Sequence, residues 1–302
     1  MALVSSDLSF KATTANFFWM GDFSIYEMAN INSFIKNGFD VNIWTYDKNF
    51  KVFSNNNKIN IKNASEILDE ELLYKFKQGN QKSNMSSFTN IFRLELLKKV
   101  GGWWFDLDCI CNKPISSFVE LVKEKPFVIG RERDDYSGSS VMYFSDFEVL
   151  QTLLDKTWEK INEKNFEFIW GEIGPDLISE IFLDLDLMKL TLEEKYFFKV
   201  SAEDFYKFFL NNTENLIALE ETLNDSYVVH TWNEMFKRSL ISKKKLPPRG
   251  SFLFNHISNN VLIEKQKSYG WLLKYRFNKY IYFFIKIIFR IKIISNNLSN
   301  NN

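Results

Sequence analysis

The chain has 302 residues, enough for one large domain or two small ones, and 31 Phe, 12 Tyr and 8 Trp residues supply apolar surface for a core. Its formal net charge is zero, so we expect no nucleic-acid partner. No signal-peptide pattern is evident at the N-terminus and no run of 18 uncharged apolar residues predicts a spanning helix.

The two cysteines, Cys109 and Cys111, are too close in sequence for a disulfide between them to link distant parts of the chain. A reduced chain in the cytoplasm is the simplest interpretation, because disulfides persist in oxidising compartments.

Strand-like and helix-like runs alternate at the start of the chain. Residues 17–20 are apolar and end at Gly21, residues 25–36 have helical spacing, and residues 41–44 are apolar again. A strand, a helix and a strand within about 30 residues predict a βαβ unit. Nucleotides bind at the carboxyl ends of such strands, and Trp19 lies at the first of these ends.

Two more helical segments lead to the most distinctive part of the chain. Residues 64–77 and 88–100 both repeat apolar side chains at helical spacing. Gly101 and Gly102 follow the second segment and can adopt the left-handed conformation that ends a helix.

Two carboxylates then follow a very apolar run. Residues 103–107 favour a buried strand. Asp106 and Asp108 are two residues apart, so on a strand their side chains would point to the same side. Carboxylate oxygens suit Mg²⁺ or Mn²⁺, which commonly bind one or two carboxylates and substrate phosphates. Two buried like charges would be costly without a cation or donors. This context favours a metal site over the solvated turn typical of isolated Asp-x-Asp pairs.

The segment after the carboxylates predicts further strands and helices. Residues 127–130 and 140–144 have strand character, and the polar residues 131–140 are expected to form a loop over a ligand. A long amphipathic helix should follow. Pro175 suits the first turn of a helix over 176–183, whose N-terminus would attract anions.

Four ordered blocks stand out along the chain. The first block is NFFWMGD at 16–22 with NGFDVNIWTYD at 37–47, and the central block is RLELLKKVGGWWFDLD at 93–108. Together with FIWGEIGPDLISEIF at 168–182 and YVVHTWN at 227–233, they resemble the DXD-containing glycosyltransferases. This group includes α-1,4-galactosyltransferases, yeast α-mannosyltransferases, bacterial capsule and lipooligosaccharide enzymes, and glucosylating clostridial toxins. FIWGEIGPDLISEIF at 168–182 is similar to the W-G-x-x-G-P block of the galactosyltransferases, and YVVHTWN at 227–233 is similar to their closing H-x-W-N.

The resemblance implies an α/β fold of the GT-A type, a nucleotide-sugar-binding mixed sheet flanked by helices, over residues 1–236. It implies a retaining transferase that uses Mn²⁺ or Mg²⁺ and moves galactose or a related hexose from a UDP-sugar to a glycan or glycolipid, such as lipooligosaccharide or capsule. A toxin-like enzyme with a protein acceptor and an inactive, membrane-bound scaffold are the alternatives. A D-x-D-x-T phosphatase is set aside because Ile110 replaces the required Thr.

The resemblance also implies roles for individual residues. The implied metal ligands are Asp106, Asp108 and His230. The implied donor contacts are Trp19, which would stack on uracil, Asn90, Arg93, Gly102, Asp106 and Trp232, whose indole would donate to the leaving phosphate. The implied catalytic residues are Asp106, Asp108, Glu172 and Asp176, the last two on the acceptor side.

Structural roles for some of these residues stay open. Asn90 stands where the toxins carry an Asp. Trp19 could equally be a core residue, and Arg93 could form an ion pair without any ligand. A first-turn acid such as Asp176 often only complements a helix dipole, and a lone His such as His230 is more often structural than a ligand.

Charge is distributed unevenly along the chain. Residues 237–302 hold 14 Lys or Arg residues and one acidic residue, a net +13, which leaves −13 for residues 1–236. Basic residues interrupt the apolar segment 271–294, so we expect it to lie on an anionic inner membrane face rather than to cross the bilayer. Packing on the domain or on a second copy is the alternative.

Overall fold

The computed structural model describes residues 12–51, 57–77 and 84–262. Within them the chain forms two compact units. The first unit comprises the described residues of 12–23, 30–199 and 225–230, and the second comprises 24–29, 200–224 and 231–262.

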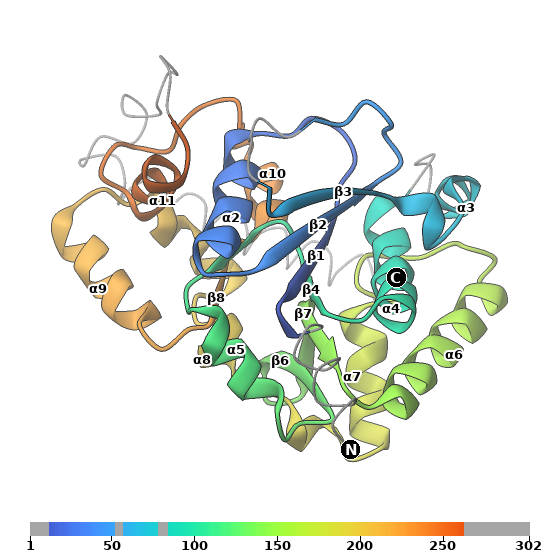
Figure 1. Ribbon diagram of the computed structural model, residues 1–302. Coiled ribbons are helices and arrows are strands. Elements are labelled where there is room, and N and C mark those ends of the chain that lie inside the picture. The colour runs from blue at the N-terminus through green and yellow to red at the C-terminus, as the bar shows by residue number, and fades with distance from the viewer. Residues whose placement is uncertain (1–11, 52–56, 78–83, 263–302) are drawn as a thin grey trace, which may run out of the picture. The chain divides into compact units, whose positions relative to one another are not determined.

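A six-stranded mixed sheet forms the centre of the first unit, in the order β3-β2-β1-β4-β7-β6 (Figure 1). Its strands are β1 (Thr14–Phe18), β2 (Asp40–Thr45), β3 (Ile59–Asn63), β4 (Trp103–Phe105), β6 (Phe127–Arg133) and β7 (Tyr136–Phe144). The pairs β1–β2, β2–β3 and β1–β4 are parallel, whereas β4–β7 and β6–β7 are antiparallel. A two-stranded ladder pairs β5 (Cys109–Cys111) with β8 (Val228–His230).

Helices cover this sheet, as expected for a GT-A-type fold, and their bounds are as follows. The first unit holds η1 (Ala64–Glu66), α3 (Glu70–Lys75), α4 (Met85–Lys99), α5 (Ile115–Val122), α6 (Phe147–Glu163), α7 (Pro175–Asp184), η2 (Met188–Leu190) and α8 (Glu194–Phe197). The second unit holds η3 (Ala202–Phe209), α9 (Thr213–Leu223), α10 (Asn233–Arg238) and α11 (Phe252–Asn260), and α2 (Ile25–Lys36) belongs partly to each.

The opening βαβ unit and the helix before the carboxylates are confirmed. The elements β1, α2 and β2 follow the predicted order, with β1 and β2 parallel. Helix α4 begins after Asn84, whose side chain accepts a hydrogen bond from the Ser87 N–H. Gly101 and Gly102 have φ values of +75° and +82°, so the glycine pair ends the helix as expected.

Three local predictions are wrong. Strand β4 ends at Phe105, because the Cys109 N–H donates to the Asp106 carbonyl at 3.0 Å and closes a turn. The two carboxylates therefore do not share one strand face. The expected loop at 131–140 is a tight hairpin, since irregularities in the β6–β7 register accommodate its polar residues within strands. The expected helix at 64–77 is divided into η1 and α3 by an irregular turn.

A buried asparagine fixes the backbone that leads into β4. Asn16 is fully buried, and its amide nitrogen donates to the carbonyls of Gly101 and Trp103, each at 3.1 Å. Its amide oxygen accepts hydrogen bonds from Asn42 at 3.0 Å and from the Trp44 indole at 3.1 Å. One side chain thus joins β1 and β2 to the glycine turn, because buried polar groups need partners.

Aromatic packing and one buried ion pair organise the second unit. Phe236 packs on Phe205 and Phe209, with ring centroids 5.9 and 5.0 Å apart. The carboxylate of Glu27 is 1% exposed and pairs with Lys243, so one lysine of the basic segment has a structural partner. No helix of the described residues has the length and apolarity to cross a membrane. The segment 271–294, expected to dock on a membrane, lies outside the described residues.

Candidate active site

The end of β4 places Asp106 beside Arg93 of α4. The Trp104 indole donates to Asp106 Oδ1 at 2.8 Å, and Arg93 Nη2 lies 3.3 Å from the same oxygen. The guanidinium also donates to the carbonyls of Ser139 and Thr89, and its carbon lies 5.2 Å from the centre of the Trp104 ring. Arg93 is therefore held by three kinds of contact: an ion pair, backbone hydrogen bonds and a cation–π contact.

Burial makes these two charges depend on each other. The Arg93 side chain is 6% exposed and that of Asp106 is 29% exposed. Burial raises the pKa of Asp106, and Arg93 opposes that effect. Burial lowers the pKa of Arg93, and Asp106 and Asp108 oppose it. Removing either partner would leave the other buried without its main compensating charge.

The turn after Asp106 presents Asp108 to the end of β8. His230 Nε2 lies 3.1 Å from Asp108 Oδ1, and the two side chains are 9% and 12% exposed. The contact follows from the β5–β8 register, which places His230 opposite Cys109, the residue after Asp108. Burial alone would lower the pKa of His230, but the carboxylates of Asp108, Asp106 and Glu132 together outweigh it, and the pKa is raised overall.

The donor set at this place fits a divalent cation. Asp108 raises the pKa of Asp106 by repulsion, in addition to the larger effect of burial. Two carboxylates that repel each other beside an imidazole are oxygen and nitrogen ligands whose repulsion a cation would relieve. Of the residues predicted as metal ligands, the structure thus brings Asp108 and His230 into direct contact and places Asp106 within their electrostatic range.

Asn90 lies one helical turn before Arg93 and packs against the start of α7. It is 5% exposed, and a Cβ atom added at Gly174 would lie 2.5 Å from its amide nitrogen. Gly174 is the N-cap of α7. The close approach therefore needs glycine, and it joins the helix of the central block to the Trp-Gly-Pro block.

The remaining predicted donor contacts are more dispersed. Trp19 follows β1, is half-buried and donates its indole N–H to the Gly21 carbonyl at 3.1 Å. Gly102 is buried in the turn before β4. Trp232 belongs to the second unit, has a φ of +61° and donates its indole N–H to the Val200 carbonyl at 2.8 Å.

The two acidic residues predicted for the acceptor side have different partners. Glu172 pairs with Lys164 and accepts the Ile169 N–H at 3.1 Å. Burial alone would raise the pKa of Glu172, but Lys164 and this hydrogen bond outweigh it, so the pKa is lowered. Asp176, in the first turn of α7, accepts a 2.7 Å hydrogen bond from the Tyr136 hydroxyl.

Glu132 is an acidic residue of this region that the sequence analysis missed. It lies on β6, and burial raises the pKa of its carboxyl group. Its charge interacts with those of His230 and Asp176, so it links the metal-ligand candidates electrostatically to the start of α7. The alternation Arg131-Glu132-Arg133, next to an apolar strand, is the signal that could have identified a strand here.

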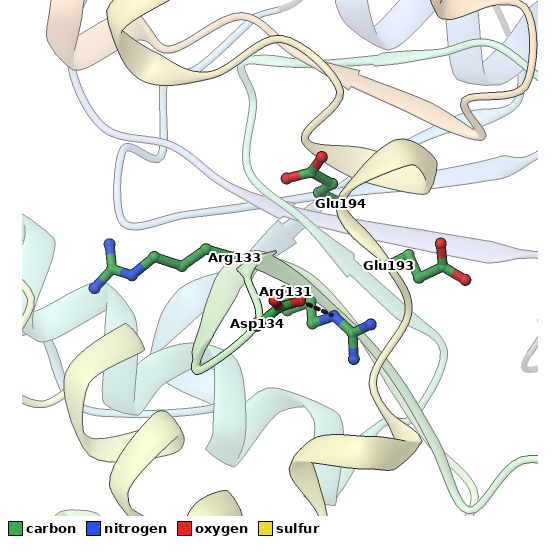
Figure 2. A pocket seen from close by; sticks show the side chains of 5 residues that line it. All are labelled: Arg131, Arg133, Asp134, Glu193 and Glu194. Atoms are coloured by element: carbon green, nitrogen blue, oxygen red, sulfur yellow. Dashed lines mark ion pairs between the residues drawn. The ribbon is translucent and has the colours of Figure 1, made fainter.

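A cavity of about 280 Å³ lies at the turn of the β6–β7 hairpin and the start of α8. Its lining residues are Arg131, Arg133, Asp134, Glu193 and Glu194 (Figure 2). Arg131 Nε is 4.0 Å from Asp134 Oδ1, and Figure 2 shows Arg133 extending away from this pair. Mixed charges of both signs suit a polar ligand with many hydroxyl groups better than a highly charged one.

Two family models match the chain. The model described as the glycosyltransferase sugar-binding region containing the DXD motif matches residues 24–128. The model described as the alpha 1,4-glycosyltransferase conserved region matches residues 147–247. No curated protein matches the chain at a significant level.

Several solved glycosyltransferase structures are similar to the chain. The PaToxG glycosyltransferase is 14% identical with a TM-score of 0.41, over 80% of this chain and 93% of that one. The apo WbbM bifunctional glycosyltransferase is 8% identical with a TM-score of 0.49, over 83% of this chain and 49% of that one. GlyE of Streptococcus pneumoniae TIGR4 is 9% identical with a TM-score of 0.39, over 82% of this chain and 63% of that one.

Proposed function

Because this chain belongs to the DXD-containing glycosyltransferases, we propose that it is a metal-dependent, retaining hexosyltransferase. The proposed donor is a UDP-sugar, with galactose or a related hexose. The proposed acceptor is a lipid-linked glycan such as lipooligosaccharide or capsule, at an anionic inner membrane face. The observation that carries the proposal is the buried cluster at the end of β4, in which Asp106 contacts Arg93 and Asp108 contacts His230.

Asp106, Asp108 and His230 would hold Mn²⁺ or Mg²⁺, which when bound neutralises the charge that develops on the departing diphosphate. Asp106 is arranged for a second task. Its contacts with Trp104 and Arg93 both use Oδ1. Oδ2 therefore remains for a metal ion or a ribose hydroxyl, as expected of a carboxylate that bridges both.

Arg93 would act as a fixed positive charge near the diphosphate. Its backbone hydrogen bonds to Ser139 and Thr89 hold the guanidinium in one orientation before any donor binds. A preorganised charge of this kind stabilises a developing anion without reorganisation during the reaction. Asn90, one turn earlier on α4, is proposed to contact the ribose or the base, and Trp19 to stack on uracil. The Gly102 backbone is a further proposed donor contact, whereas a donor contact of Trp232, whose indole N–H is bonded to the Val200 carbonyl within the second unit, stays a prediction.

On the acceptor side, Asp176 is the carboxylate connected to the metal-ligand candidates. Its charge interacts with Glu132, whose charge in turn interacts with His230. We place the reacting sugar near Asp176 and Glu132, which would orient hydroxyl groups or stabilise positive charge at the anomeric carbon. The mixed-charge cavity lined by Arg131, Arg133, Asp134, Glu193 and Glu194 would take a further sugar of the acceptor. The catalytic role that the resemblance implies for Glu172 stays a prediction. Because Glu172 is already paired with Lys164, we propose instead that it holds the loop before α7.

The test is donor hydrolysis with purified full-length protein, Mn²⁺ and a panel of UDP- and GDP-sugars, followed by release of free nucleotide. The matched variants are Asp108→Asn and Asp155→Asn, since Asp155 is an exposed aspartate of α6. We expect UDP release from one sugar, abolished by Asp108→Asn or by chelation and unaffected by Asp155→Asn. Equal behaviour of both variants, or no nucleotide-sugar binding at all, would overturn the proposal.

A second arm of this experiment identifies the acceptor class. Turnover that rises when lipid-linked glycan is added, and does not rise with a protein mixture, supports the glycolipid acceptor. The opposite pattern would favour a protein-modifying transferase.

A further inference from the structure

A thiol lies within the cluster of metal-ligand candidates. Cys109 is fully buried, and the β5–β8 register places it directly opposite His230. Opposed residues of a ladder project to the same side. A carboxylate oxygen of Asp108, the Cys109 sulfur and a ring nitrogen of His230 all lie within 4.8 Å of one another.

We propose that Asp108, Cys109 and His230 form a site for a soft or borderline divalent cation, Zn²⁺ or Co²⁺, with the Cys109 thiolate as a ligand. The site shares Asp108 and His230 with the proposed catalytic metal. Its occupation therefore excludes Mn²⁺ and inhibits the enzyme, and this second consequence rests on the proposed function. The thiolate site itself does not.

The ligand chemistry distinguishes the two classes of cation. Zinc suits a site with one sulfur, one nitrogen and one oxygen ligand and an open fourth position. Thiolates favour soft cations, and affinities of mixed sites rise from Mn²⁺ through Co²⁺ to Zn²⁺. Mg²⁺ and Mn²⁺ prefer oxygen ligands. A cysteine next to the second carboxylate thus shifts this site toward softer metals.

The geometry needs only small side-chain rotations. Bond lengths of about 2.0–2.3 Å place the ligand atoms of a tetrahedral zinc roughly 3.4–3.6 Å apart. Asp108 and His230 are already 3.1 Å apart. Binding replaces the sulfur–hydrogen bond of Cys109 by a sulfur–metal bond, and the proton leaves to solvent.

The chain contains a matched control in the same strand. Cys111 is also buried and lies two residues further along β5, opposite Val228. Its sulfur is 3.3 Å from the Lys113 carbonyl oxygen. Cys111 is not a member of the three-residue group. A general effect of free thiols would appear with both cysteines, whereas a ligand effect is confined to Cys109.

The experiment adds Co²⁺ to metal-free, full-length protein and records the sulfur-to-cobalt charge-transfer absorption. We expect the band in the wild type and in Cys111→Ser, and its loss in Cys109→Ser. Competition with Zn²⁺ should show that Cys109→Ser lowers the affinity for Zn²⁺ by about 10- to 100-fold or more. That is the loss typical when a residue that only supports a metal ligand is changed. Circular dichroism and thermal melting of each variant check that it is folded, and Cys109→Ala is a second variant of the same thiol.

No band in the folded wild type, or an equal band in folded Cys109→Ser and Cys109→Ala, overturns the proposal. Mn²⁺-dependent nucleotide release is measured separately on the same preparations. A band without any donor hydrolysis would reject the proposed function and keep the thiolate site. Donor hydrolysis without a cobalt band would reject the thiolate site and keep the proposed function.

Discussion

Two acidic regions of the first unit differ in how their charges are compensated. At the end of β4, Asp106 and Asp108 are largely buried, and their partners Arg93 and His230 are themselves buried and chargeable. Before α7, the Glu172 side chain is itself 14% exposed, but its partner Lys164 is 47% exposed. The first arrangement concentrates charge in a place of low dielectric, whereas the second resembles an ordinary surface ion pair.

We propose that this difference separates residues that bind a ligand from residues that hold a loop. Buried, coupled charges interact strongly with any charged ligand that enters. A carboxylate that already has an exposed lysine as partner contributes little to the binding of such a ligand. The comparison therefore predicts a ranking of effects on activity, from Asp108 through Arg93 and Glu132 to Glu172.

The largest effect is expected from Asp108→Asn. The amide keeps the shape and a possible hydrogen bond to His230, but loses the negative charge that the metal requires. Loss of several kcal/mol of charge stabilisation corresponds to about a thousandfold or greater fall in kcat/KM. Steady-state assays with Mn²⁺ check this, with Asp155→Asn as the control. If kcat/KM fell less than tenfold in both Asp108→Asn and Asp155→Asn, the contrast between the two regions would be lost.

Arg93→Lys should follow. A lysine keeps the charge but cannot contact Asp106 and the Ser139 and Thr89 carbonyls at once. We expect kcat to fall about 10²- to 10³-fold, as for loss of one preorganised donor. Lys98→Arg, at a solvent-exposed position of the same helix, is the control. A variant as active as wild type would show that Arg93 has only a structural role.

The sequence predicted the elements that carry these charges better than their exact geometry. Local patterns were sufficient for α4, its glycine termination and the βαβ opening, because each depends on neighbouring residues. The Asp108–His230 contact was implied only by resemblance, since it depends on the pairing of β5 with β8 across more than a hundred residues. Glu132 was missed because its strand was taken for a loop. Nothing local in the sequence shows that Asn16 supports the glycine turn.

Glu132→Gln tests whether the acceptor side is coupled to the cluster. A hydrogen bond from an acceptor hydroxyl to the Glu132 carboxylate, which this variant would weaken, is worth about 1.5–3 kcal/mol, or roughly 10- to 150-fold in kcat/KM. The loss should be greater for turnover with acceptor than for donor hydrolysis alone, which distinguishes an acceptor role from a general loss of folding. Asp135→Asn, at the exposed turn of the same hairpin, is the control. Equal losses in both assays would place Glu132 on the donor side instead.

The smallest effect is expected from Glu172→Gln. Its ion pair with a half-exposed lysine contributes about 0.2–1 kcal/mol to stability, and activity should stay close to that of wild type. Because the folded-state pKa of Glu172 is lowered, this stability is present above its ordinary value of 4.5 and is lost as the pH falls through the lowered pKa. The free energies of unfolding of the wild type and of Glu172→Gln, measured by denaturant titration, should therefore differ at pH 7 and converge in acid. A wide activity gap would move Glu172 into the catalytic group.

A metal ion held at the end of β4 is the feature on which the proposed transferase activity depends most directly. Titration of Mn²⁺ into full-length protein with UDP, followed by electron paramagnetic resonance of the free ion, measures that binding without any need for an acceptor. We predict one UDP-dependent Mn²⁺ per wild-type chain, strongly weakened binding in Asp108→Asn, and wild-type binding in Asp155→Asn. UDP-dependent Mn²⁺ binding that is the same in Asp108→Asn as in the wild type would contradict the assignment of the site.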